Sequence, residues 1–145
     1  MTVKFKKLKE NAKIPSYGSP YAAGADLYSA EDGDICIEPG QTAMIHTGIA
    51  IELPSGVAGL VYARSGMACK RGLAPANKVG VIDSDYRGEL IVALHNHGTQ
   101  PQTVAPCDRI AQLVITPCFT AEFVEADELS QTVRGDGGFG STGVK

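Results

Sequence analysis

The sequence lacks the features that mark membrane proteins and general nucleic-acid binders. No window approaches 18 consecutive apolar residues, and the first residues contain no apolar signal core. Lys+Arg 13 against Asp+Glu 16 give a net charge of −3, so the chain has no cationic excess for nucleic acid or for a membrane surface. We therefore expect a soluble protein of the cytoplasm that binds neither nucleic acid nor membranes.

Metal-binding and redox motifs are also missing. The chain has no Cys-x-x-Cys pair, which leaves a zinc ribbon or a dithiol redox site without support; its four cysteines are Cys36, Cys69, Cys107 and Cys118. His95 and His97 could face a metal from one side of a strand, but no third ligand is nearby in the sequence. We favour the interpretation that both are loop histidines.

Long stretches suited to helix are absent too. Eight prolines, spread from Pro15 to Pro117, leave no long uninterrupted helical stretch before residue 118, and a proline in a helix interior costs about 3 kcal/mol. Glycine and proline make up about 17% of the chain, against roughly 12% in an average protein. Since a hydrophobic content of 43% argues against disorder, we expect one all-β domain of short strands and tight turns.

Alternation of apolar and polar residues predicts where the strands lie. An edge strand is expected near the N-terminus, where Val3 and Phe5 alternate with lysines. The other predicted strands are residues 35–37, 42–53 (interrupted at Gly48), 57–62, 89–94, 109–115 and 121–124. One short helix is expected, with Ser65 as its N-cap and its end near Gly72.

The composition changes after Val133. Residues 134–145 are rich in glycine and have no core-forming pattern, so we divide the chain into a β core (residues 1–133) and a flexible C-terminal segment (residues 134–145). In that segment the backbone offers N–H groups to an anion, Arg134 adds a positive charge, and Phe139 offers a face for stacking. By composition alone, a disordered terminus is the more common explanation.

Two internal segments could carry chemistry. Arg64, Ser65 and Gly66 stand where a strand gives way to the short helix, and a helix N-terminus beside an arginine and a hydroxyl suits phosphate. An ordinary helix with a surface arginine explains these residues equally well. Asp83 follows two β-branched residues, so we expect it at a strand end, partly desolvated, where it could act as a general base. A turn residue without a chemical role is the alternative.

Taken together and in order, five segments closely resemble the five motifs of the trimeric dUTPase (deoxyuridine triphosphate nucleotidohydrolase) family. They are residues 23–30 (Ala-Gly-Ala-Asp-Leu-Tyr-Ser-Ala), 64–68 (Arg-Ser-Gly-Met-Ala), 80–89 (Gly-Val-Ile-Asp-Ser-Asp-Tyr-Arg-Gly-Glu), 109–113 (Arg-Ile-Ala-Gln-Leu) and the glycine-rich 134–143. Their joint occurrence is highly specific, although Ala63 stands where the family usually has proline. The resemblance implies a jelly-roll-like β-barrel with one short helix, a homotrimer, and active sites built from shared chains.

The resemblance also implies an activity, the hydrolysis of dUTP to dUMP and pyrophosphate with Mg²⁺. This reaction limits uracil incorporation into DNA and supplies dUMP for dTTP synthesis. Asp83 would activate the water that attacks the α-phosphorus, and Asp26 would act on the magnesium through its waters. The substrate-binding residues that the resemblance implies are Arg64, Ser65, Gly66, Asn77, Gly80, Val81, Tyr86, Gln112, Arg134, Phe139, Gly140 and Ser141.

These residues would divide the substrate among them. The Arg64 segment and Gln112 would hold the phosphate chain, while Asn77 and the hairpin that begins at Gly80 would select uracil. Tyr86 would pack under the deoxyribose and leave no room for a 2′-hydroxyl. The last segment would act as a lid over the bound substrate: Arg134 on the γ-phosphate and Phe139 over the uracil.

Two alternatives remain beside this interpretation. A dCTP deaminase shares the fold and the trimer, but the Asp-Tyr-Arg-Gly run at 85–88 and the glycine-rich C-terminus favour the pyrophosphatase. A nucleotide-binding regulator could keep the fold without the chemistry. Retention of Asp83, Gln112, Arg134 and Phe139 together argues against that alternative.

Overall fold

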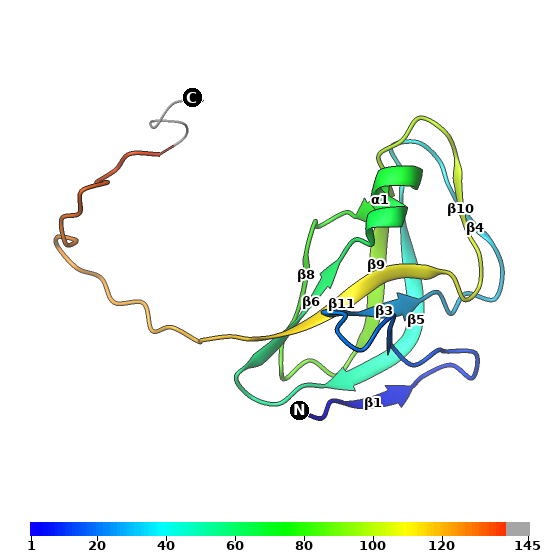
Figure 1. Cartoon of the computed structure of the whole chain (residues 1–145), viewed down its shortest axis with the longest axis horizontal. Helices are drawn as coiled ribbons and strands as arrows, with labels where there is room; N and C mark the ends of the chain where they lie inside the picture. Colours follow the sequence, from blue (N-terminus) through cyan, green and yellow to red (C-terminus); the bar gives the residue numbers. More distant parts are fainter. Residues whose placement is uncertain (139–145) are drawn as a thin grey trace.

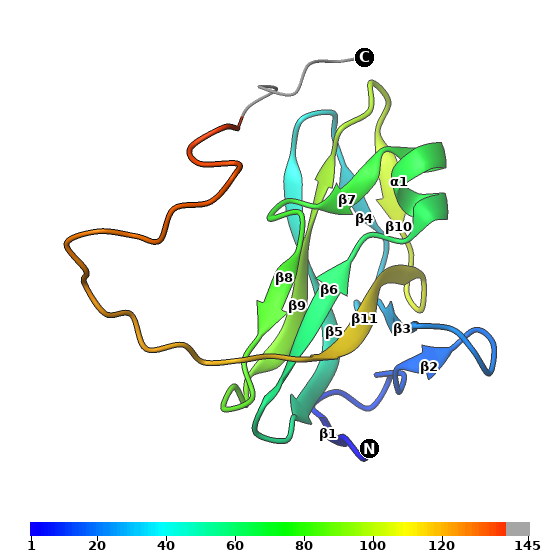
Figure 2. The same cartoon turned by 60° about the vertical axis from the view of Figure 1, so that its left-hand side comes forward.

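The structure, a computed structural model, describes residues 1–138 and contains two antiparallel sheets with a short helix at one end (Figures 1 and 2). One sheet has the order β1 (Lys4–Lys7), β5 (Thr42–Glu52), β9 (Glu89–Asn96), β7 (Leu73–Pro75). The other has the order β2 (Ser16–Tyr17), β3 (Gly24–Tyr28), β11 (Arg109–Pro117), β6 (Val57–Tyr62), β8 (Gly80–Ile82). A separate pair joins β10 (Gln102–Val104) to β4 (Ile35–Ile37), and α1 spans Ser65–Arg71. The expected all-β, jelly-roll-like fold is confirmed.

The hydrophobic core lies between the two large sheets. In β9 the side chains alternate, so that Leu90, Val92 and Leu94 are buried while Ile91 is exposed. The buried residues of β9 belong to the same apolar cluster as Leu27 of β3 and Leu113 of β11, which come from the other sheet. Burial of apolar surface from both sheets is the main stabilising contribution to such a sandwich.

A bulge interrupts β5 at Gly48, where the sequence predicted a break. The pairing register between β5 and β9 shifts between His46 and Ala50, and Gly48 has a φ of 65°. A Cβ at Gly48 would lie 2.8 Å from the Cβ of Ala12, so both the backbone conformation and the space favour glycine.

Most of the predicted strands are present, and the N-terminal edge strand and the single helix are confirmed. The strand predicted at residues 121–124 is wrong, because that segment has no partner strand within the described chain. The predicted N-cap is also wrong: Arg64 occupies the N-cap position without a side-chain capping bond, and Ser65 is the first helical residue. Four strands of two to five residues were not predicted, because such short segments carry little periodicity; they are β2, β3, β7 and β10.

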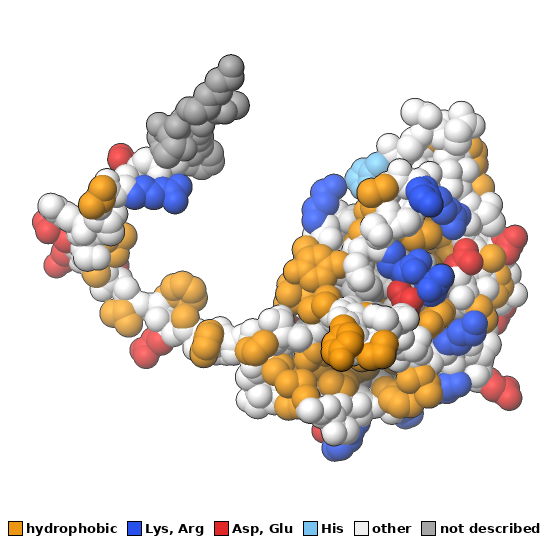
Figure 3. Space-filling view, in the orientation of Figure 1, with side chains coloured by type: hydrophobic (Ala, Val, Ile, Leu, Met, Phe, Trp, Pro, Cys, Tyr) orange, Lys and Arg blue, Asp and Glu red, His pale blue; other side chains and the backbone are white. Residues whose placement is uncertain are grey.

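Beyond β11 the chain leaves the two sheets as an extended segment (Figures 1 and 2). It carries exposed apolar side chains along its length (Figure 3); they are Phe119, Phe123, Val124, Leu129 and Val133. Within residues 1–138, no helix has the length and apolar character needed to cross a membrane.

Candidate active site

A polar pocket of about 230 Å³ lies where the start of α1 meets β3 and β11. Its lining residues are Gly18, Ala22, Gly24, Asp26, Arg64, Ser65, Gly66, Arg109 and Gln112. The pocket thus brings together five residues that the sequence predicted for one site, from three separate motifs: Asp26, Arg64, Ser65, Gly66 and Gln112. On the face shown in Figure 3, basic side chains lie around an acidic one beside α1.

One carboxylate between two guanidinium groups forms the charged part of the pocket. Arg64 donates from Nε to Oδ1 of Asp26 at 2.7 Å, and Arg109 donates from Nη1 to Oδ2 at 3.4 Å. The side chain of Asp26 is only 13% exposed, so both ion pairs are partly shielded from water. Two cations and one anion leave a net positive charge, which suits a polyanionic ligand.

The first turn of α1 adds backbone donors. Arg64 has extended backbone angles, with φ −83° and ψ 136°, and its carbonyl accepts the first helical hydrogen bond from Ala68 N at 3.0 Å. The N–H groups of Ser65 and Gly66 therefore have no partner within the helix, and both residues are exposed beside the pocket. Free N–H groups at a helix start, beside the Ser65 hydroxyl, are suited to binding phosphate oxygens.

Gln112 fixes the side of the pocket opposite the helix. It lies on β11, where it pairs with Asp26 of β3 on one side and Tyr62 of β6 on the other. Its Nε2 donates to the carbonyl of Ala63 at 2.9 Å, which holds the residue before Arg64 against β11. A Cβ on Gly24 would lie 2.8 Å from Oε1 of Gln112, so the absence of a side chain at Gly24 makes room for the amide.

A second group of predicted residues lies on and after β8, at the edge of the same sheet. Asp83 follows directly after the strand, as predicted, and a turn closes with Tyr86 N donating to Asp83 O at 3.2 Å. The Tyr86 hydroxyl donates to the carbonyl of Glu89 at 3.0 Å, and a side chain at Gly88 would collide with the Tyr86 ring. The Tyr86 ring is thus fixed against the turn that follows β8, and Asp83 lies at the start of this turn.

The uracil-selecting residues predicted from the resemblance belong to this second group. Asn77 precedes β8 and is exposed, and its amide nitrogen would lie 3.5 Å from a Cβ built on Gly80. Gly80 pairs with Val61 of β6, while the side chain of Val81 is 61% exposed. Asn77, Gly80, Val81 and Tyr86 therefore lie along one edge strand and its turns, available to a ligand or to another chain.

One chain does not bring the two groups together. Ile82, the residue before Asp83, pairs with Gly59, whereas Arg64 lies beyond the opposite end of β6. Gly59 and Arg64 are five residues apart, which is about 16 Å of extended chain at about 3.3 Å per residue. Asp83 is exposed, so residues 1–138 of one chain do not give it the partial desolvation that was expected.

The C-terminal candidates lie apart from both groups. Arg134 is exposed on the extended segment and donates from Nε to the carbonyl of Gly137 at 2.8 Å. Phe139, Gly140 and Ser141 lie outside the described residues.

Sequence reasoning did not assign Arg109, Gly24, Gly18 and Ala22 to the pocket that they line. Arg109 and Gly24 lie within the quoted motif segments, so their motif membership was an available signal. Gly18 and Ala22 belong to the loop between β2 and β3, and no local pattern marks them. Their place in the pocket follows from the pairing of β2 with β3.

Glu89 connects the Asp83 hairpin to the bulge in β5. Its Oε2 accepts from the His46 ring at 2.9 Å, and its Oε1 accepts from Gly48 N at 2.7 Å. Burial raises the pKa of the Glu89 carboxyl, but these two hydrogen bonds, with the charges of His46 and Lys9, outweigh burial and lower the pKa overall. The carboxylate therefore remains ionised, and its two hydrogen bonds join β9 to β5 at the bulge.

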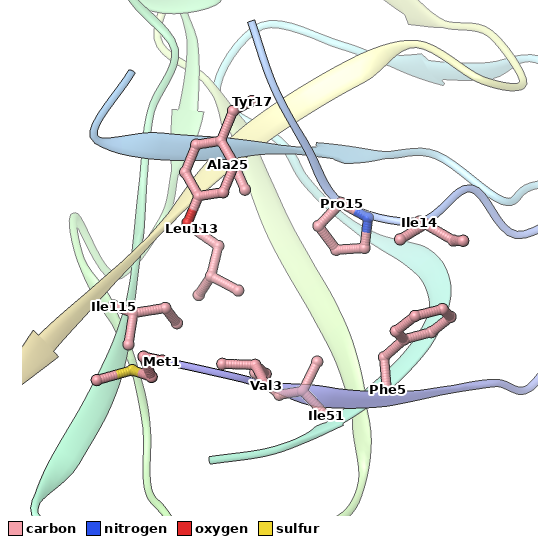
Figure 4. Close-up of a pocket in the computed structure, with 10 residues that line it drawn as sticks. All are labelled: Met1, Val3, Phe5, Ile14, Pro15, Tyr17, Ala25, Ile51, Leu113 and Ile115. Atoms are coloured by element: carbon pink, nitrogen blue, oxygen red, sulfur yellow. The ribbon is translucent and has the colours of Figure 1, made fainter. Parts of the chain in front are cut away.

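An apolar pocket of about 300 Å³ lies on a different part of the surface (Figure 4). Side chains from β1, β2, β3, β5 and β11 line it, together with residues before β1 and before β2; they are Met1, Val3, Phe5, Ile14, Pro15, Tyr17, Ala25, Ile51, Leu113 and Ile115. None of these is charged, so the pocket is suited to contact with another apolar surface rather than to catalysis.

A family model described as dUTPase matches residues 10–143. Among curated proteins, deoxyuridine 5′-triphosphate nucleotidohydrolase from Desulfitobacterium hafniense is 59% identical over 133 residues, 91% of this chain and 88% of the relative. The protein of the same name from Syntrophotalea carbinolica is 47% identical and covers 99% of this chain and 97% of its own.

Solved structures give the same family. A mutant of the Staphylococcus bacteriophage 80alpha dUTPase with dUpNHpp superimposes with a TM-score of 0.92, at 31% identity over 99% of both chains. A mutant dUTPase from phage phi11 of S. aureus, described as coordinating a structural Mg(II) ion, has a TM-score of 0.81. It is 28% identical, over 88% of this chain and 98% of its own.

Proposed function

Because the chain belongs to the dUTPase family, we propose that it hydrolyses dUTP to dUMP and pyrophosphate. The observation that carries this proposal is the polar pocket. In it, Arg64 and Arg109 flank the mostly buried carboxylate of Asp26, beside the unpaired N–H groups at the start of α1. The proposed place of the reaction is the cytoplasm, where it limits uracil incorporation into DNA and supplies dUMP for dTTP synthesis.

The pocket is proposed to hold the phosphate chain. Arg64 presents a planar guanidinium with several donors, which matches phosphate oxygens better than a point charge does. Ser65 and Gly66 add a hydroxyl and backbone N–H groups, and Gln112 keeps the segment before Arg64 against β11. The ion pair with Asp26 engages Arg64 through Nε, so it orients the guanidinium before substrate arrives.

The carboxylate of Asp26 fits an Mg²⁺ ion that is held through water molecules rather than bound directly. Both oxygens of Asp26 accept from arginines, and within residues 1–138 no three acidic, histidine or cysteine side chains gather into a metal cage. Magnesium commonly keeps several waters and binds through one carboxylate and substrate phosphates. Asp26 would hold those waters, and the bound ion would supply neutralisation of the charge that develops on the phosphates.

Asp83 is proposed as the general base. It would orient a water and accept its proton while the water attacks the α-phosphorus in line with the pyrophosphate leaving group. The turn from Asp83 to Tyr86 and the Tyr86–Glu89 hydrogen bond hold the carboxylate in place. Asn77 and the backbone of Gly80 and Val81 would select uracil, with Tyr86 against the deoxyribose.

A complete site then needs more than one copy of the chain. The antiparallel pairing of β8 with β6 directs Asp83 away from Arg64, so another copy must supply one of the two groups. We propose a homotrimer in which neighbouring copies share each site. The apolar pocket of Figure 4 and the exposed apolar side chains of residues 119–133 are surfaces that contact between copies would cover.

The C-terminal segment is proposed as a lid. Arg134 would bind the γ-phosphate, Phe139 would cover the uracil, and Gly140 and Ser141 would add backbone and hydroxyl donors. A glycine-rich segment of this kind closes over a substrate and excludes bulk water during the reaction.

One assay tests the activity directly. The purified chain is incubated with dUTP or dCTP and Mg²⁺, and dUMP, pyrophosphate and ammonia are followed. Pyrophosphate and dUMP from dUTP are expected. Ammonia from dCTP would replace the proposal with a deaminase, and tight binding without turnover would replace it with a nucleotide-binding regulator. Sedimentation of the same sample, expected at three chain masses, tests the trimer.

A further inference from the structure

Arg71, the last residue of α1, makes a group of contacts behind the polar pocket that the proposed reaction does not use. Its Nε donates to Oε1 of Gln102 at 3.1 Å, its Nη2 donates to the carbonyl of Thr103, and its Nη1 lies 3.8 Å from Oδ2 of Asp108. The side chain is 31% exposed, and it is absent from the lining of the pocket. One guanidinium therefore connects α1 to β10 and to the turn before β11.

Asp108 extends this connection to β3. Its Oδ2 accepts from Ala105 N at 3.0 Å, which closes the turn that leads into Arg109. Its carbonyl accepts from Ser29 N at 2.8 Å, and Ser29 O accepts from Cys107 N at 2.9 Å. Because Ser29 directly follows β3, the turn is bonded to the strand that carries the pocket carboxylate.

Through Asp108 and its turn, Arg71 is linked to β11 and β3, the two strands that line the pocket together with the start of α1. Pairing of β3 with β11 fixes Asp26 relative to Gln112. The helix has no such ladder, because α1 is seven residues long and belongs to no sheet. The start of the helix is held by the Gln112–Ala63 bond and by the Arg64–Asp26 ion pair, and its middle by the buried side chain of Met67. At its end, His97 N donates to the carbonyl of Gly72 at 2.8 Å, and Arg71 supplies the side-chain contacts described above.

We propose that Arg71 is a positioning residue for phosphate binding, which sets the orientation of the Arg64–Ser65–Gly66 turn against β3 and β11 without touching the substrate. Met67 and Arg71 share one face of the helix, and Arg71 Nη1 donates to Met67 Sδ at 3.6 Å. Without Arg71, the C-terminal end of the helix loses its bonds to β10 and its ion pair with the turn before β11, and the N-terminal donors are held less precisely against Asp26 and Arg109. This inference rests on the proposed function, since it assigns the pocket to phosphate.

The test compares wild type with Arg71→Met, which keeps the apolar stem and removes the guanidinium. Lys70→Met is the matched control: it removes one positive charge from the same helix turn, and within residues 1–138 Lys70 is exposed and makes no side-chain hydrogen bond. Arg71→Lys keeps the charge but cannot reach three acceptors at once, so its effect should be intermediate.

Two measurements on the full chain are read together. The first is the Kd for inorganic tripolyphosphate, measured by calorimetry, which reports on the pocket whether or not dUTP is hydrolysed. The second is KM and kcat for dUTP. For Arg71→Met we expect Kd and KM to rise by roughly tenfold, with kcat within about twofold of wild type, because uniform binding of the phosphates is lost. Lys70→Met should match wild type in both.

The outcomes separate this proposal from its rivals. A fall in kcat per mole of total protein at unchanged KM would mean that Arg71 only supports folding, which overturns the proposal. Unchanged Kd and KM in a folded Arg71→Met protein would also overturn it. If Arg71→Met does not fold, Gln102→Leu removes one acceptor from β10 instead, and a rise in Kd and KM is again required. Tripolyphosphate binding that depends on Arg71 without dUTP hydrolysis would uphold the positioning role while the proposed function fails.

Discussion

Arg64 and Asp26, 38 residues apart in the sequence, form an ion pair of 2.7 Å between Nε and Oδ1 at the start of the only helix that the described chain contains. Arg109 completes the arrangement from β11, at 3.4 Å from the other carboxylate oxygen. Asp26 thus orients two cations that a phosphate chain would otherwise have to organise on binding. Preorganisation of this kind lowers the cost of binding a charged ligand.

The first prediction concerns this carboxylate. In Asp26→Asn the amide keeps one acceptor oxygen but loses its charge, and the waters of a magnesium ion lose an anionic partner. We expect the Mg²⁺ concentration for half-maximal dUTP hydrolysis to rise by about tenfold or more, the usual effect of removing an outer-shell partner. Titration of activity with Mg²⁺ measures the shift. Asp34→Asn, an exposed acid after β3, is the control; a wild-type Mg²⁺ curve for Asp26→Asn would remove Asp26 from the metal site.

The second prediction concerns the proposed base. Asp83→Asn should lose turnover by at least about 100-fold, within the range of general-base catalysis, while binding of a non-hydrolysable dUTP analogue stays near wild type. Stopped assays of dUMP formation and calorimetry of the analogue measure the two quantities. Asp85→Asn changes a neighbouring exposed acid of the same hairpin and should keep activity. Near-normal turnover of Asp83→Asn would assign the base to another residue.

The third prediction concerns the C-terminal segment. A chain that ends after Val133 loses Arg134 and the glycine-rich motif but retains both sheets. We expect a sharp loss of activity with no change in the sedimentation of the trimer, because the lid contributes to the closed site and not to the core. Thermal unfolding of both forms at equal chain concentration checks that the core is intact. A truncated trimer with normal turnover would contradict the lid.

The family motifs indicated residues that lie in the pocket, but not the contacts that hold the pocket together. The resemblance implied that Asp26, Arg64 and Gln112 serve one site, and the structure brings the three into one pocket, while alternation located the long strands. The ion pair of Arg109 with Asp26 and the contacts of Arg71 join residues far apart in the sequence, which no local pattern encodes.

The wrong predictions have physical reasons of the same kind. Serine is a favourable N-cap residue, but the helix begins one residue earlier than predicted. Arg64 is the last residue with extended backbone angles, so Ser65 and its hydroxyl lie inside the first turn. The alternation in residues 121–124 is real, yet a strand needs a partner for its backbone groups, and the described chain provides none there. Asp83 is exposed because no residue among 1–138 covers the end of β8.

The last prediction concerns pH and the carboxylate of Glu89, which joins the hairpin of Asp83 to the bulge at Gly48. Because the pKa of this carboxyl is lowered in the folded chain, the ionised form favours folding. The stabilisation is therefore fully present above the ordinary pKa of 4.5 and is lost as the pH falls through the lower pKa of the folded state. At pH 7, Glu89→Gln should lower the free energy of unfolding by about 1.5–3 kcal/mol, the range for hydrogen bonds to a charged group.

Thermal unfolding of wild type and Glu89→Gln, measured from pH 7 to pH 3 at one chain concentration, checks the sign. At pH 7 the variant should unfold at a lower Tm, by about 3 °C for each kcal/mol lost. The difference in Tm should narrow steadily as the pH falls below 4.5. Protonation of the wild-type carboxyl then removes the negative charge that strengthens its hydrogen bonds from His46 and Gly48. Glu10→Gln, an exposed carboxyl, should follow wild type throughout. A gap that stays constant with pH would show that Glu89 acts through packing, because a contribution from its charge must vanish when the charge does.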